Sequence, residues 1–310
     1  MKQVLYFVFL TLTLVQGHQV VHRRGSTHSN TKEVPKVTES STDTALLNLM
    51  LKTVPIPFND KHLFRLISHA CKSDMSQQCK QKTKTALHCD FSQKTCYVTG
   101  TPLVFQVYVF SKTKYADYEE KADLAPGSEE FANQQKYQAV FLPFVEHGDT
   151  YTILDPFRAP WFFTAELGGC DIFVATVENQ GNKPLVVHSN RNEEKVDIVK
   201  NLKLKEESVD ALIQSLNPDY KVIARVHFTS TNKEEKKKID QHLSEYAATP
   251  RHKGIVFIPY DNGIEPLDGG GFHFFGNYNG GWTFVLKGIS SGKIFYTLSV
   301  SAKGDIVNVY

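Results

Sequence analysis

The chain has 310 residues, with 35 lysines and arginines against 33 aspartates and glutamates, which gives a net charge of +2. This near-balance provides no general case for a nucleic-acid partner or for binding to an anionic membrane surface. A chain of this length can bury a substantial core, either as one large domain or as a small domain joined to a larger one.

The first 17 residues have the features of a cleaved secretory signal peptide. Lys2 precedes an apolar run from Val4 to Val15, and Gly17 completes a cleavage site of small or apolar residues. The run is too short to span a bilayer, and no later stretch approaches about 20 apolar residues. Residues 18–43 are rich in Ser, Thr, Lys and His without apolar periodicity, which predicts a flexible leader. We therefore expect a secreted, soluble mature chain.

Residues 44–100 are expected to form a small helical module held by disulfides. A Leu-dense segment at 44–54 and a second segment that follows Asp60 both have helical spacing. Such a module is too small for a large core, so its four clustered cysteines are expected to form two disulfides. These cysteines are Cys71, Cys79, Cys89 and Cys96. All three pairings remain open, and a zinc site is the competing interpretation, disfavoured because no Cys-x2-Cys pair is present.

From residue 101 onward, short apolar, β-branched and aromatic runs predict strands. They are expected at 103–110, 139–142, 151–154, 172–177, 184–190, 222–228, 254–258, 271–275, 282–286, 294–298 and 305–309. The charged segment 112–136 predicts a surface loop or short helix. Two helices are expected between residues 206 and 246, the second opened by a capping box at Thr231 to Glu234. Residues 288–292 match the GxSxG string of serine hydrolases, but they join two predicted strands and so predict a hairpin turn.

Together these elements predict an α+β protein. Its main part, residues 101–310, is expected to be a mixed β-sandwich-like catalytic domain with two helices. The disulfide-stapled module at 44–100 precedes it and is expected to act as a cap packed on the larger domain.

A cysteine and a histidine flank one predicted β-hairpin near the middle of the chain. Cys170 precedes an apolar run, the chain turns at 178–183, and the returning strand reaches His188. An imidazole beside a thiol takes its proton and stabilises the thiolate, so this pair is a candidate dyad. A symmetric turn would pair His188 with Phe173, which leaves the thiol about three residues, roughly 10 Å, away along the strand. A bulge or bend at the preceding glycines would have to close that gap.

The two glycines before Cys170 suggest an oxyanion site. Glycine has no Cβ, so backbone N–H groups there approach a developing negative charge closely. The expected donors are the N–H groups of Gly169 and Cys170. Because the other four cysteines are expected to be paired, Cys170 is the thiol expected to stay free. The alternative interpretation is that Cys170 is a buried small hydrophobe and His188 an ordinary strand-end histidine.

The motif resembles that of known deamidases. Leu167-Gly-Gly-Cys170 with a histidine eighteen residues on resembles the Leu-Ser-Gly-Cys…His motif of the cytotoxic necrotizing factor catalytic domains and related protein glutamine deamidases. It is also similar to the Thr…Gly-Ser-Cys…His pattern of bacterial chemoreceptor deamidases, whose threonine lies six residues before the cysteine, as Thr164 does. The resemblance covers residues 161–190. Gly168 stands where the necrotizing factors have serine, and Gly169 stands where the chemoreceptor deamidases have serine.

This resemblance implies a β-sandwich-like core and a secreted toxin-like or effector-like protein glutamine deamidase. Cys170 would attack the side-chain amide carbon, and His188 would accept the thiol proton and then protonate the leaving ammonia. Water would hydrolyse the thioester, and Thr164 or a backbone carbonyl would orient His188. The substrate would be a host protein with a reactive glutamine, with a small GTPase suggested by the toxin resemblance alone. No cofactor or catalytic metal is expected.

Two alternatives come from other classes of protein. A cysteine peptidase or transglutaminase would use the same thiol, with His227 on the predicted strand 222–228 as its base. A non-enzymatic secreted binding protein would leave Cys170 buried in the core. If His227 instead of His188 lies beside Cys170, the peptidase or transglutaminase is favoured over the deamidase.

Overall fold

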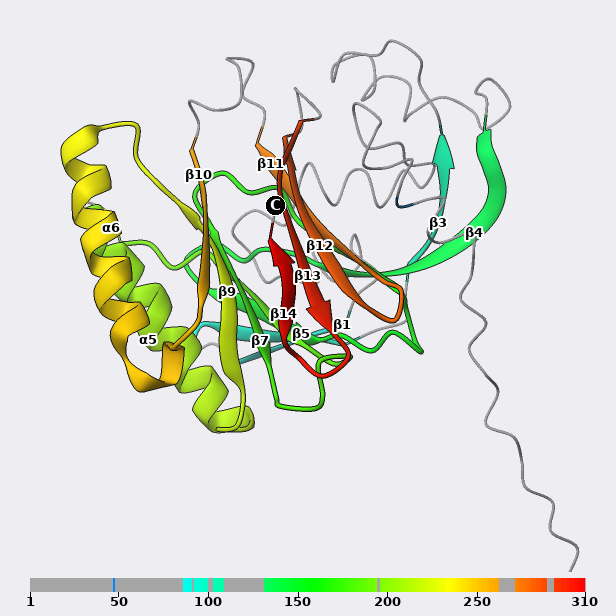
Figure 1. Ribbon diagram of the computed structural model, residues 1–310, viewed down its shortest axis with the longest axis horizontal. Helices are drawn as coiled ribbons and strands as arrows, with labels where there is room; N and C mark the ends of the chain where they lie inside the picture. The colour runs from blue at the N-terminus through cyan, green and yellow to red at the C-terminus, as the bar shows by residue number, and fades with distance from the viewer. Residues whose placement is uncertain are drawn as a thin grey trace, which may run out of the picture. The chain divides into compact units, whose positions relative to one another are not determined.

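The fold is described from a computed structural model of the chain. The described residues are Leu47 and the ranges 86–90, 92–99, 103–108, 131–193, 196–261, 271–288 and 293–309. Within these residues the chain forms two mixed sheets of seven strands each, two α-helices and one short 3-10 helix (Figure 1). The predicted α+β class, with a mixed sandwich-like arrangement of strands, is confirmed.

The first sheet, sheet A, carries the candidate hairpin at its centre. Its strands in spatial order are β1 (Ala86–Asp90), β2 (Thr95–Thr99), β5 (Asp149–Ile153), β8 (Leu185–Ser189), β7 (Asp171–Thr176), β9 (Lys221–Phe228) and β10 (Val256–Tyr260). The pairs β2–β5 and β9–β10 are parallel, and the other pairs are antiparallel. Every residue of β7 and β8 is buried. Their apolar residues therefore face packed neighbours on both sides of the sheet, as fully buried strands require.

The second sheet, sheet B, collects most of the C-terminal strands. In spatial order it consists of β14 (Ile306–Val309), β13 (Ile294–Ser301), β12 (Gly281–Gly288), β11 (Phe272–Tyr278), β6 (Trp161–Thr164), β4 (Phe131–Leu142) and β3 (Leu103–Tyr108). Only the pair β4–β6 is parallel among these strands. Residues 131–136 belong to β4, so the end of the segment 112–136 is strand instead of a surface loop or helix. β12 pairs with β13 in antiparallel orientation, and residues 289–292 of the expected hairpin turn lie outside the described part of the chain.

The main hydrophobic core lies between the two sheets. Sheet A contributes Ile172, Val174 and Val186, and sheet B contributes aromatic side chains such as Phe274 and Phe284. The rings of these two phenylalanines stack with centroids 5.6 Å apart. Aromatic side chains bury large areas, so this layer supplies much of the hydrophobic stabilisation that holds the sheets together.

Two helices cover the other face of sheet A. In Figure 1, α5 (Ile198–Leu216) and α6 (Lys233–Ala248) run beside each other along β9 and β10. A second hydrophobic cluster joins Val209 and Ile213 of α5 to Phe173 and other side chains of the central strands. Sheet A is therefore enclosed on both faces, and any group on β7 or β8 is shielded from water by a helix layer or by sheet B.

A disulfide closes the hairpin formed by β1 and β2. Cys89 and Cys96 are directly opposite each other in the register and are joined by a disulfide. Because β2 pairs with β5, this hairpin belongs to sheet A. Residues 86–99 therefore form part of the larger domain's sheet and are not part of a separate helical module. A disulfide is compatible with an oxidising compartment such as the extracellular space.

Several expectations concern residues outside the described part of the chain. These are the signal peptide at 1–17, the leader at 18–43, and the helices and cysteines of the segment 44–85, apart from Leu47, which is helical. No helix in the described ranges is both long enough and apolar enough to cross a lipid bilayer.

Candidate functional site

Cys170 lies in a turn that leads from sheet B into sheet A. Leu167 forms an isolated antiparallel bridge with Phe272 of β11, and the chain then passes through two glycines to reach β7. The cysteine is 6% exposed and belongs to the hydrophobic core between the sheets. It is the free cysteine of the described residues. Its side chain therefore points to the inter-sheet side, as that of Ile172 two residues later does.

The register of the hairpin places His188 on this same side. His188 pairs with Ile172 and not with Phe173, so the symmetric turn expected from the sequence is wrong by one residue. Because strand side chains alternate between faces, a shift of one residue moves a side chain to the opposite face. Cys170 and His188 thus point to the same face of sheet A, two positions apart along the strand. Diagonal neighbours of this kind are separated by about 7–8 Å between backbones.

His188 occupies an unusually costly position for a polar side chain. It is fully buried, and neither ring nitrogen has a hydrogen-bond partner among the described residues. Its ring lies 6.1 Å from that of Phe144, which follows β4. Burial, together with the nearby ammonium of Lys205, lowers the pKa of His188 to about 3, and Asp171 acts in the opposite direction. The imidazole is therefore neutral at physiological pH in this conformation.

Thr164 faces the same inter-sheet space from sheet B. It ends β6, and alternation places it on the side of Phe162, which belongs to the core between the sheets. Its hydroxyl donates a hydrogen bond to the carbonyl oxygen of Ala165 at 2.7 Å. Both nitrogens of His188 are without partners, so Thr164 does not orient the imidazole in this conformation. The three motif residues therefore all face the core between the sheets, and no hydrogen bond links them among the described contacts.

Tyr260 fixes the backbone of the turn. Its hydroxyl accepts a hydrogen bond from the N–H of Gly169 at 3.1 Å and donates one to the carbonyl oxygen of Cys170 at 2.5 Å. Gly169 has a φ of +132°, a conformation that side chains rarely adopt, so glycine is needed there. Because Tyr260 occupies the N–H of Gly169, this expected oxyanion donor is already bonded in the present conformation.

The thiol of Cys170 is protonated at neutral pH in this conformation. Burial raises the pKa of Cys170 to about 12. The ammonium of Lys205 and the N–H of Gly168 act in the opposite direction, and the carboxylate of Asp171 adds to the increase. A thiolate is the reactive form of cysteine, so the described arrangement does not hold Cys170 in its reactive form.

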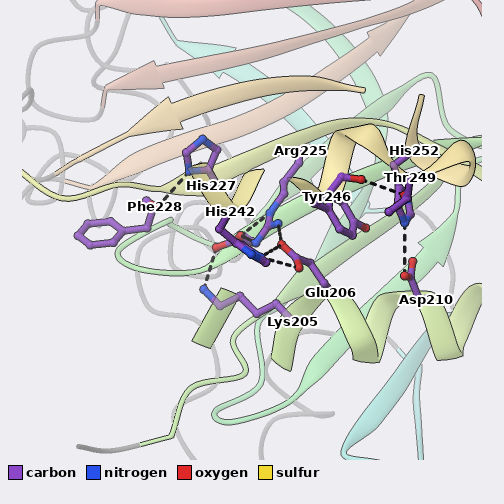
Figure 2. Close-up of polar contacts among 11 residues, drawn as sticks. Lys205, Glu206, Asp210, Arg225, His227, Phe228, His242, Tyr246, Thr249 and His252 are labelled. Atoms are coloured by element: carbon purple, nitrogen blue, oxygen red, sulfur yellow. Dashed lines mark hydrogen bonds and ion pairs between the residues drawn. The ribbon is translucent and has the colours of Figure 1, made fainter. Parts of the chain in front are cut away.

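A chain of buried charges lies on the helix side of the turn (Figure 2). Lys205 contacts Asp171 at 2.7 Å, and Asp171 binds Arg225 at 2.7–2.8 Å. Arg225 reaches Glu206, whose carboxylate lies 2.8 and 2.9 Å from the Nε2 atom of His242. These side chains are at most about a tenth exposed. Each buried charge therefore has an opposite charge beside it, as buried ions require.

None of these five residues was predicted to be part of the site. Lys205 and Glu206 occur in a lysine- and glutamate-rich stretch that looks solvated. One signal was available: both residues precede Val209 by three or four positions, which places them on the buried stripe of the helix.

A cavity of about 430 Å³ opens beside the same turn. It is lined by Gly169, Lys205 and Leu202, by the chain around Asn192, by Phe228 at the end of β9, and by Lys238 of α6. Phe228 also contacts the ring of Tyr260, with centroids 5.8 Å apart. The cavity thus lies at the strand ends next to the candidate site.

His227, the alternative base, points to the other face of sheet A. Val226 pairs with Ile172 and belongs to the inter-sheet core, so its neighbour His227 faces the helix side. Its Nδ1 lies 3.2 Å from the carbonyl oxygen of Phe228, and burial lowers its pKa to about 4. His188 is thus the histidine that shares a face with Cys170.

The described residues contain no group of three His, Cys, Asp or Glu side chains arranged to hold a metal ion. No protein-family model, curated protein or solved structure matched this chain. The functional argument therefore depends on the motif and on the geometry around it.

Proposed function

We propose that the protein is a glutamine deamidase that uses Cys170 as nucleophile and His188 as proton acceptor. The observation that supports it most is the state of His188, which is fully buried with both nitrogens unpaired on the face that carries the thiol. An unsatisfied buried polar group costs about 1–3 kcal/mol. A purely structural position would be filled more favourably by an apolar residue, so a chemical role accounts for the histidine.

The chemistry requires a proton to move from sulfur to the imidazole. His188 takes the Cys170 proton as the sulfur attacks the amide carbon of glutamine, which gives a tetrahedral oxyanion. Collapse of this intermediate breaks the carbon–nitrogen bond, and the imidazolium protonates the departing ammonia. Water then attacks the thioester with His188 again as base, which yields glutamate and the free thiol.

Two rearrangements separate the resting conformation from the reactive one. The sulfur and the imidazole have to come within hydrogen-bond distance, which for diagonal neighbours requires a side-chain rotation or a small movement of the turn. The N–H of Gly169 also has to leave Tyr260 if it is to bind the oxyanion together with the N–H of Cys170. Substrate binding at the strand ends is the event proposed to drive both changes.

The proposed substrate is a glutamine in a host protein, and the proposed setting is outside the producing cell. The resemblance to the necrotizing toxins points to a small GTPase as the host protein. The apolar N-terminal segment of the sequence and the Cys89–Cys96 disulfide support export.

The test compares the wild-type protein with Cys170→Ser and His188→Ala on a host-cell lysate. Mass spectrometry should find site-specific conversion of glutamine to glutamate with wild type and none with either variant, because both residues act in one chemical step. Thr164→Val should lower the rate less, and His147→Ala, at an exposed histidine, should convert like wild type. Conversion that persists in Cys170→Ser would exclude this nucleophile. New backbone termini would indicate a peptidase, and incorporation of amines at glutamine would indicate a transglutaminase.

One observation favours a second candidate, a non-enzymatic binding protein. Cys170 is 6% exposed and its pKa is raised to about 12, as for an inert core cysteine. This candidate predicts that the native thiol does not react with iodoacetamide at neutral pH in the presence or absence of a glutamine-bearing substrate. The deamidase predicts slow reaction that a bound substrate analogue alters.

A further inference from the structure

Lys205 connects helix α5 to both residues that flank the candidate nucleophile. Its Nζ atom lies 2.9 Å from the carbonyl oxygen of Gly169 and 2.7 Å from Oδ1 of Asp171. We propose that Lys205 is a positioning residue for Cys170, whose ammonium fixes the turn and favours the thiolate over the thiol. The inference depends on the proposed function in taking Cys170 as the reacting group.

The surrounding ion pairs hold the ammonium in one place. Arg225 binds Oδ2 of Asp171, which leaves Oδ1 to Lys205. Glu206 holds Arg225 from α5, and His242 approaches Glu206 from α6 (Figure 2). The Lys205 side chain is 3% exposed. A buried ammonium with two fixed partners has little freedom to move, so its charge acts on the turn from a constant position.

The charges near the thiol agree with this role. Among the neighbouring charges, Lys205 has the largest effect on Cys170, and it lowers the pKa of the thiol. Asp171 opposes it, and the pKa of Tyr260, whose hydroxyl contacts the backbone on both sides of the thiol, is raised mainly by burial and then by Cys170. Lys205 also lowers the pKa of His188, which keeps the imidazole neutral. An opposite charge within about 4–6 Å typically lowers a pKa by 1–3 units.

A second lysine in the same cavity provides a matched control. Lys238 of α6 lines the cavity together with Lys205, but it is exposed and forms no hydrogen bond or ion pair with the turn among the described residues. Removing Lys238 takes the same charge from the cavity without touching Gly169 or Asp171. A specific role of Lys205 can thus be separated from a general effect of positive charge.

The experiment measures the rate of Cys170 alkylation by iodoacetamide between pH 7 and pH 10 in the full chain without reductant. Labelling at Cys170 is quantified by peptide mass spectrometry for wild type, Lys205→Met, Lys205→Arg and Lys238→Met. Lys205→Met should react at least about tenfold more slowly at each pH, because the thiolate fraction falls when the cation is removed. Lys205→Arg should remain within about threefold of wild type, and Lys238→Met should be unchanged.

Several results would overturn the inference. The first is an equal rate of Cys170 alkylation in Lys205→Met and wild type. The second is a loss of reactivity in Lys205→Arg as large as that in Lys205→Met. The third is a wild-type thiol that stays unreactive up to pH 10. If Lys205→Met does not fold by circular dichroism, Lys205→Gln replaces it, since glutamine keeps a donor and lacks the charge. Labelling requires no turnover of glutamine. A protein that labels as expected but converts no glutamine would retain the role of Lys205 and lose the deamidase assignment.

Discussion

The hydroxyl of Tyr260 donates a hydrogen bond to the carbonyl oxygen of Cys170 at 2.5 Å, which ties the last residue of β10 to the turn before β7. The same hydroxyl accepts the N–H of Gly169. One phenol therefore satisfies two backbone groups in a buried region, where an unpaired polar group is expensive.

Tyr260→Phe should destabilise the protein because it removes both hydrogen bonds and keeps the ring. We expect the free energy of unfolding in urea to fall by about 1–3 kcal/mol, the cost of unsatisfied buried groups. Tyr296→Phe is the control, since that hydroxyl lies on partly exposed β13 and has no hydrogen bond among the described residues. Equal midpoints for the two variants would show that the Tyr260 hydroxyl contributes nothing to stability.

Substitutions at the two glycines of the turn should differ in effect. Gly169→Ala forces a side chain into a backbone with φ of +132°, and we expect a loss of about 1 kcal/mol or more. Gly168→Ala should be tolerated, because an added Cβ there meets no atom within 4 Å. Thermal unfolding of both variants tests the difference. Tolerance at Gly169 together with damage at Gly168 would contradict the described turn.

Loss of the disulfide should loosen the edge of sheet A before its centre. The double variant Cys89→Ala, Cys96→Ala removes a cross-link that closes a short loop, which is worth about 2 kcal/mol in the chain-entropy account. Hydrogen exchange should rise in β1 and β2 and stay slow in β7 and β8, which are buried throughout. Faster exchange that begins in the central strands would refute this order.

Stability should fall in mild acid through His188. Its pKa is about 3 in the folded protein, below the 6.5 of an unperturbed histidine, so the unfolded state binds the proton more readily. The contribution of this group to the free energy of unfolding is therefore complete above pH 6.5 and is lost as the pH falls from 6.5 toward 3, by roughly 4–5 kcal/mol. His188→Phe should flatten the decline measured by urea unfolding, whereas exposed His147→Gln should leave its slope unchanged.

Glu166 should produce the opposite dependence at higher pH. Burial raises its pKa to about 7, while the hydrogen bond from the N–H of Gly271 acts against this increase. A carboxyl with a raised folded pKa contributes stability below the unfolded value of 4.5, and this contribution is lost as the pH rises through 7. Glu166→Gln should therefore raise the melting temperature at pH 8 and leave it almost unchanged at pH 4.5. A lower melting temperature at pH 8 would contradict this.

Local patterns in the sequence were sufficient to predict the class of fold. Alternating and continuous apolar runs predicted most strands. The capping box was displaced by one residue, because Asn232 and not Thr231 caps α6. The first turns of α5, residues 198–205, were missed because they carry Lys205 at a buried position, and charged residues normally indicate a solvated face.

The candidate site depended on information that no local pattern contains. The register of the hairpin is decided by the turn, where Gly181 packs against Gly304 so closely that a Cβ would clash. The partners of Asp171 come from α5 and β9, and Tyr260 comes from β10. Long-range pairing of this kind follows from packing of the whole domain, so the face occupied by His188 could not be derived from its own neighbourhood.

The sequence separation of the contacts at Cys170 has a consequence for biosynthesis. The bond from Lys205 to the turn spans 36 residues, and the bond from Tyr260 spans 90. Since a chain is made from its N-terminus, the ribosome has to release β10 before the turn obtains its last contact, and distant pairings form late in folding. The turn that carries Cys170 therefore lacks its defined geometry until translation of the chain is nearly complete.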